Sequence, residues 1–367
     1  MRRSNNLQHL LILGLSGPII ALNIWLLSQV FRYFEHLITV LTISAILSFL
    51  LNYPVQSLSR FRFSRNQSVI IVLLLTLTLF VILGVTLVPS VIDQTTDLLN
   101  EIPAWLKASN ENLNRWDEWT KARRLPLDLK VIRDRINATI ETQVQAVASQ
   151  AVGFAGILVS GLLDFVLVVV LAFYMLLFGE RLWHSLINLL PSPIGLSLSE
   201  SLRLNFQKFF ISQLLLGLFM VVTLTPIFFA LNVQFPLLFA LLIGFGELIP
   251  FIGATLAIGM VTILVMLQNF GLAIQVAIAS IIMQQIKDNL LAPKLMGDFI
   301  GLNPIVIFIT LLLGGKIAGL LGVIVSVPIA GTIKGTIDTI RLQRQAQVVT
   351  TETVFTDESE HSREVES

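Results

Sequence analysis

Apolar residues occur in this chain as long runs that contain no charged side chain. The runs recur at about the length that crosses a bilayer as a helix, roughly 20 residues. They lack the short alternating segments of a transmembrane β-barrel. The pattern therefore predicts an all-α integral membrane protein with about eight transmembrane helices. The expected spans are 10–31, 37–53, 67–89, 154–178, 209–231, 237–267, 271–286 and 304–333.

Two of these spans, 237–267 and 304–333, are interrupted by glycine and proline. They resemble each other in sequence, with Gly246 of the first aligned to Gly314 of the second. Backbone groups freed by such breaks must be buried in protein or line a water-filled cavity. Paired breaks therefore indicate a transporter's binding site, although two ordinary kinks in packed helices are the simpler explanation. The residues of the breaks are Gly246, Pro250, Gly253, Gly314, Gly315 and Gly319.

Segment 91–150 differs in character from the apolar runs. It holds nine acidic and eight basic side chains. Its apolar residues from Leu98 to Trp119 fall roughly three, four or seven apart, which is typical of an amphipathic helix. We expect a small helical insertion outside the bilayer, either a lid or packing arm, or an element that receives a partner or substrate.

The chain thus divides into four regions. Residues 1–90 form a three-span membrane region, 91–150 the insertion, and 151–340 a membrane region with interrupted helices. Residues 341–367 form a polar tail that we expect to be disordered. With eight crossings, the basic clusters between spans all fall on one side, which predicts that both termini lie in the cytoplasm.

Composition narrows the functional classes. Only 13% of the residues are charged, against about 25% in soluble domains, and the mean hydropathy is +0.83. A net charge of +1 does not indicate binding to nucleic acid. The absence of cysteine excludes disulfides and thiolate or iron–sulfur chemistry. The four histidines are scattered, so no metal site is expected. Motifs for ATP hydrolysis, zinc peptidases and serine hydrolases are missing, so we expect neither an enzyme nor a cofactor.

Each break carries one ionisable residue. Glu247 is the only charged residue among the 78 from Phe209 to Ile286, and Lys316 occupies the corresponding break. A charge at the bilayer centre costs about 2.5–3.5 kcal/mol on insertion scales, which the flanking apolar residues offset without explaining the carboxylate. Three interpretations remain: Glu247 carries a proton or cation during transport, pairs with Lys316, or is kept neutral by desolvation.

A polar segment, 287–299, joins the last two predicted spans. By itself it has the composition of a solvated connecting loop. Beside a transport site it would line an entrance, and its candidate residues are then Asp288, Asn289 and Pro293.

Three stretches carry a family resemblance: ELIPFIGATLAIG at 247–259, QQIKDNLLAPKLMG at 284–297, and GLNPIVIFITLLLGGKIAGLLGVIVSVPIAGTIK at 301–334. They resemble the autoinducer-2 exporter family of bacterial multi-pass permeases. Ala254 stands where that family usually has proline, and Lys287 where relatives commonly have an acidic residue. The resemblance implies export of autoinducer-2 or sodium/proton antiport, and it is compatible with a homo-oligomer.

From these observations we expect a secondary transporter that exports a small polar solute across the bacterial cytoplasmic membrane. Its site would lie where the two breaks meet, with Glu247 as the coupling group and Lys316 as its counter-charge. Its partners would be the lipid bilayer and a small-molecule or ion substrate. The alternatives are a cation/proton antiporter and, in another class, a channel-like or structural membrane protein.

Overall fold

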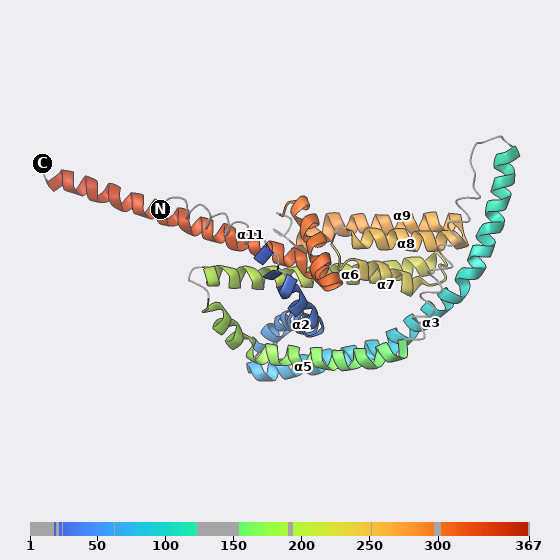
Figure 1. Ribbon diagram of the computed structural model, residues 1–367, viewed down its shortest axis with the longest axis horizontal. Coiled ribbons are helices and arrows are strands. Elements are labelled where there is room, and N and C mark those ends of the chain that lie inside the picture. The colour runs from blue at the N-terminus through green and yellow to red at the C-terminus, as the bar shows by residue number, and fades with distance from the viewer. Residues whose placement is uncertain are drawn as a thin grey trace, which may run out of the picture.

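The computed structural model describes residues 18–19, 22–23, 25–61, 63–122, 154–189, 194–250, 252–296 and 302–365. Its elements are all helices, with no strand in this part of the chain (Figure 1). Six of the described helices are long and apolar enough to cross a membrane, and two shorter apolar helices accompany them. The prediction of an all-α multi-pass membrane protein is confirmed. Half of the expected span 10–31 lies outside the described residues.

The N-terminal region packs three helices together: α2 (Glu35–Ser59), α3 (Arg65–Ala122) and α5 (Phe154–Ile187). Helix α3 begins at a reciprocal cap. The backbone N–H of Gln67 donates to Ser64 Oγ, and the backbone N–H of Ser64 donates to the side-chain oxygen of Gln67. At 1.5 Å per residue, a helix of 58 residues is about 87 Å long. It therefore extends far beyond a bilayer and forms the first part of the predicted insertion. The rest of the insertion, 123–150, lies outside the described residues.

The C-terminal region is built on α6 (Ile194–Ala230), α7 (Pro236–Gly246), α8 (Gly253–Gln268) and α9 (Phe270–Ile286). Consecutive helices of this set pack side by side (Figure 1). Polar residues form the tight turns between them. Asn232 adopts the left-handed conformation, with φ at 57°, between α6 and α7. Asn269 starts α9 by accepting a hydrogen bond from the Leu272 N–H.

Helices α7 and α8 form an antiparallel hairpin. Gly246 at the end of α7 lies against Gly253 at the start of α8, where a Cβ on Gly246 would come 2.8 Å from the Gly253 carbonyl oxygen. At the other end, the side chain of Gln268 donates a hydrogen bond to that of Gln234. The two helices are about 16 and 24 Å long, and a bilayer core is about 30 Å thick. The predicted interrupted span 237–267 is therefore a hairpin that returns to the side from which it came.

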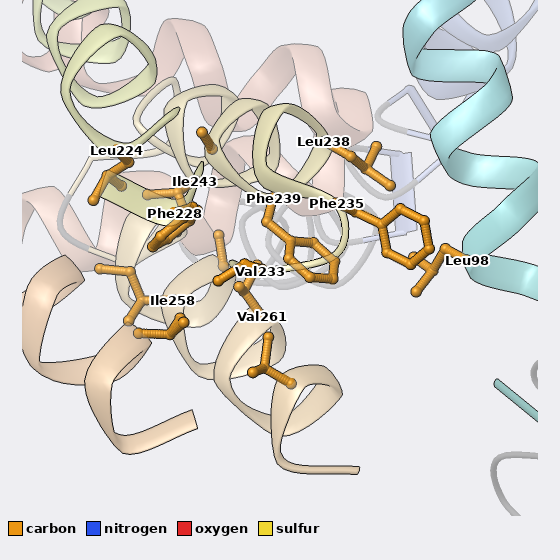
Figure 2. Packing of buried hydrophobic residues seen from close by; sticks show 14 of the residues in the cluster. Leu98, Leu224, Phe228, Val233, Phe235, Leu238, Phe239, Ile243, Ile258 and Val261 are labelled. Carbon is orange, nitrogen blue, oxygen red and sulfur yellow. The ribbon is translucent and has the colours of Figure 1, made fainter. Parts of the chain in front are cut away.

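The extension of α3 packs against the mouth of this hairpin. Leu98, Ile102 and Trp105 are buried there, and the ring centroids of Trp105 and Phe235 are 6.0 Å apart. Figure 2 shows Leu98 facing Phe235 within the core formed by α6, α7 and α8. The side-chain oxygen of Gln94 accepts a hydrogen bond from the Leu238 N–H at 3.1 Å, which satisfies a free donor in the first turn of α7. Of the two roles expected for the insertion, this portion has the geometry of a packing arm.

The polar segment expected as a loop is helical over its described residues, 287–296, which corrects the prediction there. Helix α9 continues without a break into a π-helix, Lys287–Leu291, and then into α10 (Ala292–Met296). The Ser212 hydroxyl of α6 donates to the Leu295 carbonyl at 2.9 Å and holds this end of the rod against α6. A polar composition predicted a loop because such residues favour solvent, but contacts with α6 retain the segment as helix.

The second interrupted span lies in α11 (Pro304–Val365), which bends sharply at Ala318 and Gly319. Gly319 has φ at 55°, a left-handed conformation that favours glycine. Gly314 and Gly322 approach so closely across the bend that no side chain fits between them. Beyond the bend the helix continues to Val365, so residues 341–365, which were expected to be disordered, are helical in the structure. No glycine or proline follows Gly335 to end the helix.

Candidate functional site

Glu247 is buried at the tip of the α7–α8 hairpin. It is the first residue after α7 and is 4% exposed. Its own N–H bonds back to the Gly244 carbonyl, and the turn is completed by the bond from Gly253 N–H to the Ile249 carbonyl. The close approach of Gly246 and Gly253 makes this turn tight. The glycines of the first break therefore place a carboxylate inside the protein, where sequence reasoning expected it.

The partner of Glu247 is Lys287, the first residue of the π-helix. Lys287 Nζ lies 2.6 Å from Glu247 Oε2, and Lys287 is also 4% exposed. The Gln284 amide stands beside the pair. Oriented to suit both charges, it donates to Glu247 Oε1 at 3.1 Å and accepts from Lys287 Nζ at 2.9 Å. Both charges are thus paired and hydrogen-bonded, which a buried ion pair requires.

Asp288 completes the cluster on its outer side. Its Oδ1 lies 3.0 Å from Lys287 Nζ, and its side chain is 49% exposed, whereas that of Glu247 is 6% exposed. The ammonium therefore bridges a buried carboxylate and an exposed one. We call Glu247, Gln284, Lys287 and Asp288 the ion-pair cluster.

Helix α6 supports the cluster from behind. Gln213 Nε2 donates to the Glu247 backbone carbonyl at 2.6 Å, satisfying an acceptor that the end of α7 leaves free. One turn further along α6, Gly217 lies against Gly244 of α7, where a Cβ on Gly217 would come 2.8 Å from the Gly244 carbonyl oxygen. This contact brings the two helices together and fixes the position from which Glu247 projects.

The pairing of Glu247 with Lys316, expected from the matched breaks, is wrong. Lys316 is exposed, and among the described residues the structure records no ion pair for it. The second break does come near the first, because Ile252 packs against the cluster that contains Ile307 and Leu311 of α11. However, the bend at Gly319 turns α11 back on itself without bringing Lys316 to the carboxylate.

The other predicted site residues divide by position. Asp288 belongs to the ion-pair cluster, whereas the Asn289 amide bonds to Gln285 of its own helix, at 2.9 Å to the carbonyl and 3.0 Å to the side chain. Pro293 lies exposed in α10. Lys287, Gln284 and Gln213 were not predicted. A usable signal existed for Lys287, which is the first charged residue after the apolar run 209–286.

An apolar cavity of about 420 Å³ lies apart from these charges. It is formed by the outer face of α8 and the extension of α3, and Ile102, Met260 and Ile263 are among its lining residues. None of its lining residues is ionisable. It therefore has the character of a surface for hydrocarbon rather than of a polar substrate site.

The ion-pair cluster and the helices around it define the class of protein. Bilayer-length helices expose large apolar side chains, and a hairpin too short to span carries a buried ion pair at its tip. This is the architecture of a multi-pass membrane transporter, in which polar residues at membrane depth mark substrate or ion pathways.

Comparison with known proteins gives the family. The AI-2E family transporter profile matches residues 16–342, and the chain belongs to this family. A Synechocystis protein named "Putative transport protein sll0063" is 37% identical over 341 residues, 92% of this chain and 86% of its own length. A second from the same organism, sll0060, is 28% identical over 88% of this chain and 94% of its own length. A protein of Halobacillus andaensis named "Sodium-lithium/proton antiporter" is 25% identical over 77% of this chain and 84% of its own length.

Proposed function

We propose that the protein is a secondary transporter that exports a small polar solute across the bacterial cytoplasmic membrane, with Glu247 as its coupling group. The observation that carries this proposal is the buried Glu247–Lys287 pair, held where a re-entrant hairpin meets a π-helix. Desolvation costs several kcal/mol for each ion, so a buried pair is poor evidence for stability. A role in function explains the pair better.

The cluster also suggests a route. Asp288 is half exposed beside Lys287, so a solute or ion arriving from solvent meets this carboxylate before the buried pair. Asn289 is less suited to such a role, because its amide is already bonded to Gln285. π-helical turns inside α-helices occur frequently at functional sites, and the π-helix Lys287–Leu291 carries both Lys287 and Asp288.

The proposed topology has six crossings and two re-entrant hairpins, which are α7–α8 and the part of α11 that bends at Gly319. Replacing two of the eight expected crossings by hairpins leaves the number of crossings even, so both termini remain on the side of the basic clusters, in the cytoplasm. The mouth of the α7–α8 hairpin and the α3 extension then face the opposite side.

Flux through purified protein in liposomes tests the proposal. We would load liposomes with autoinducer-2, impose a pH gradient and measure release for the wild type and for Glu247→Gln. The matched control is Glu180→Gln, which removes a carboxylate from an exposed ion pair with Arg65. We expect gradient-driven release that Glu247→Gln abolishes and Glu180→Gln preserves. Release that does not depend on the pH gradient and is equal in all three proteins would contradict coupling through Glu247.

A cation/proton antiporter is the second candidate, favoured by the name of the Halobacillus relative. The same liposomes, containing a pH-sensitive dye, distinguish it. Antiport predicts that Na⁺ or Li⁺ added outside drives proton movement without any organic solute. A structural role predicts instead that Glu247→Gln is silent while substitutions at Leu98 or Trp105 are not.

A further inference from the structure

The oxygen atoms around Lys287 Nζ resemble the ligands of a monovalent metal cation. Glu247 Oε2 lies at 2.6 Å and Asp288 Oδ1 at 3.0 Å, and the Gln284 amide oxygen lies at 2.9 Å when the amide is oriented to suit both charges. Two carboxylates and an amide carbonyl are hard oxygen donors, which suit hard cations. An ammonium has no acceptor and three N–H donors. One of these donates to Glu247 Oε2, the reoriented Gln284 oxygen accepts from the ammonium, and Asp288 Oδ1 lies within ion-pair distance.

We propose that the Lys287 ammonium is a tethered cation, which occupies an oxygen cage that would otherwise bind Na⁺ or Li⁺. The protein then does not depend on these ions. Its carboxylates bind the Lys287 ammonium at one stage and a substrate at another. This inference rests on the proposed function for its consequence in transport, but the cage itself is tested by binding.

The surroundings of the cage support a binding site rather than a plain ion pair. Ser280, Gln284 and Lys287 are four and three residues apart, so they share one face of α9. The Ser280 hydroxyl is fully buried and has no hydrogen-bond partner among the described residues. A buried hydroxyl without a partner is unusual unless a ligand or water meets it.

The charge balance of the cage also supports the proposal. Two carboxylates face one ammonium, so with both carboxylates ionised the cluster carries a net charge of −1 while Lys287 is in place. Without the ammonium it would carry −2 beside the apolar α7–α8 hairpin, a strong attraction for any cation that fits. The half-exposed Asp288 gives such a cation access from solvent.

Lys287→Met tests the cage directly, because methionine keeps most of the stem and vacates the position of Nζ. We would measure the melting temperature of the purified protein in choline chloride and then in increasing NaCl or LiCl. We expect no specific change for the wild type and a saturable rise for Lys287→Met. Adding Glu247→Gln to that variant should remove the rise. The matched control is Lys294→Met, which removes an exposed lysine from α10.

A second variant keeps the proposal testable if Lys287→Met does not fold. Lys287→Ala removes the atoms of propylammonium, so propylammonium should raise its melting temperature or restore a single peak in size-exclusion chromatography. The double variant Glu247→Gln/Lys287→Met should fold in choline alone.

Either of two results would contradict the proposal that Lys287 is a tethered cation. One is a saturable Na⁺ response of the wild type that Glu247→Gln removes, since the cage would then already be open. The other is a Lys287→Met protein that responds no more than Lys294→Met, with no recovery of Lys287→Ala by Na⁺, Li⁺ or propylammonium. Absence of flux in the liposome experiment would count against the transport role only, because these readouts do not depend on flux.

Discussion

At the scale of single residues, the stability of the buried pair depends on both of its members. Lys287→Met leaves the Glu247 carboxylate buried without its counter-charge, which typically costs about 3–5 kcal/mol. Replacing both charges, in Glu247→Gln/Lys287→Met, leaves neutral side chains of similar volume and should cost far less. We expect the double variant to be more stable than either single variant. Unfolding measured in detergent with choline as the only cation checks this, and additive losses would contradict it.

The bend in α11 depends on the backbone conformation of Gly319. With φ at 55° and ψ at −139°, alanine there is strained by about 1–3 kcal/mol, and no atom lies within 4 Å of the added Cβ to complicate the effect. We therefore expect Gly319→Ala to lower the melting temperature. Gly259→Ala in α8 is the control, because it also adds a Cβ to open space but in a helix, where alanine is favoured by about 0.5–1 kcal/mol. Equal shifts in both variants would be inconsistent with strain at the bend.

Sequence alone located Glu247 but not its partner. A lone carboxylate in an apolar run stands out in any hydropathy pattern, and glycine and proline around it indicated the broken helix. Matching the two breaks then suggested Lys316, since repeats imply related positions. Pairing is decided in three dimensions, however, and the α7–α8 hairpin brings Glu247 back to the end of α9, where Lys287 lies 40 residues further along the chain.

At the scale of helices, the approach of α6 to α7 positions the hairpin tip. A Cβ on Gly217 would meet the Gly244 carbonyl oxygen at 2.8 Å and lie 3.7 Å from the Cβ of Glu247. Because the near atom is backbone, Gly217→Ala must push the helices apart, at a cost of about 1–3 kcal/mol. We expect lower thermal stability and slower flux. Gly84→Ala in α3, with no atom within 4 Å, should change neither, and a fully active Gly217→Ala would show that the contact does not position Glu247.

The helices themselves were largely predictable, because long apolar runs have few other stable forms in a bilayer. Hydropathy could not decide whether 237–267 crosses or re-enters, since its 31 residues suit one kinked span as well as two short arms. The π-helix at Lys287–Leu291 was also beyond prediction, because a shift from α to π hydrogen bonding leaves no mark in composition. The packing of α6 against the π-helix and against α10 decides that segment.

At the scale of the whole molecule, the α3 extension, the α7–α8 hairpin and the bent helix α11 form one continuous arrangement. Gln94 and Trp105 hold the mouth of the α7–α8 hairpin, while Ile252 at its tip packs against the core shared with α11. The ion-pair cluster at the hairpin tip therefore lies between the α3 extension at the hairpin mouth and the bent helix α11. Movement of either element would shift the α7–α8 hairpin and so change the position of Glu247 relative to Lys287.

The topology of this arrangement gives the last prediction. In a re-entrant hairpin, Gln234 and Gln268 lie together at the mouth, as their hydrogen bond shows. In a spanning segment they would be separated by the bilayer core, about 30 Å. The chain contains no cysteine, so paired cysteines can be introduced without further changes. We expect Gln234→Cys/Gln268→Cys to be joined by a short bis-maleimide linker in intact membranes.

The same cysteines, introduced singly, report the side of the membrane. A membrane-impermeant maleimide applied outside intact cells should label Gln234→Cys and Gln268→Cys but spare Phe61→Cys, which lies in the exposed turn before α3. After the cells are opened, all three should react. Labelling of the two glutamine positions from opposite sides, together with failure of the linker, would establish a spanning segment. It would also place Glu247 within a transmembrane helix rather than at the tip of a hairpin.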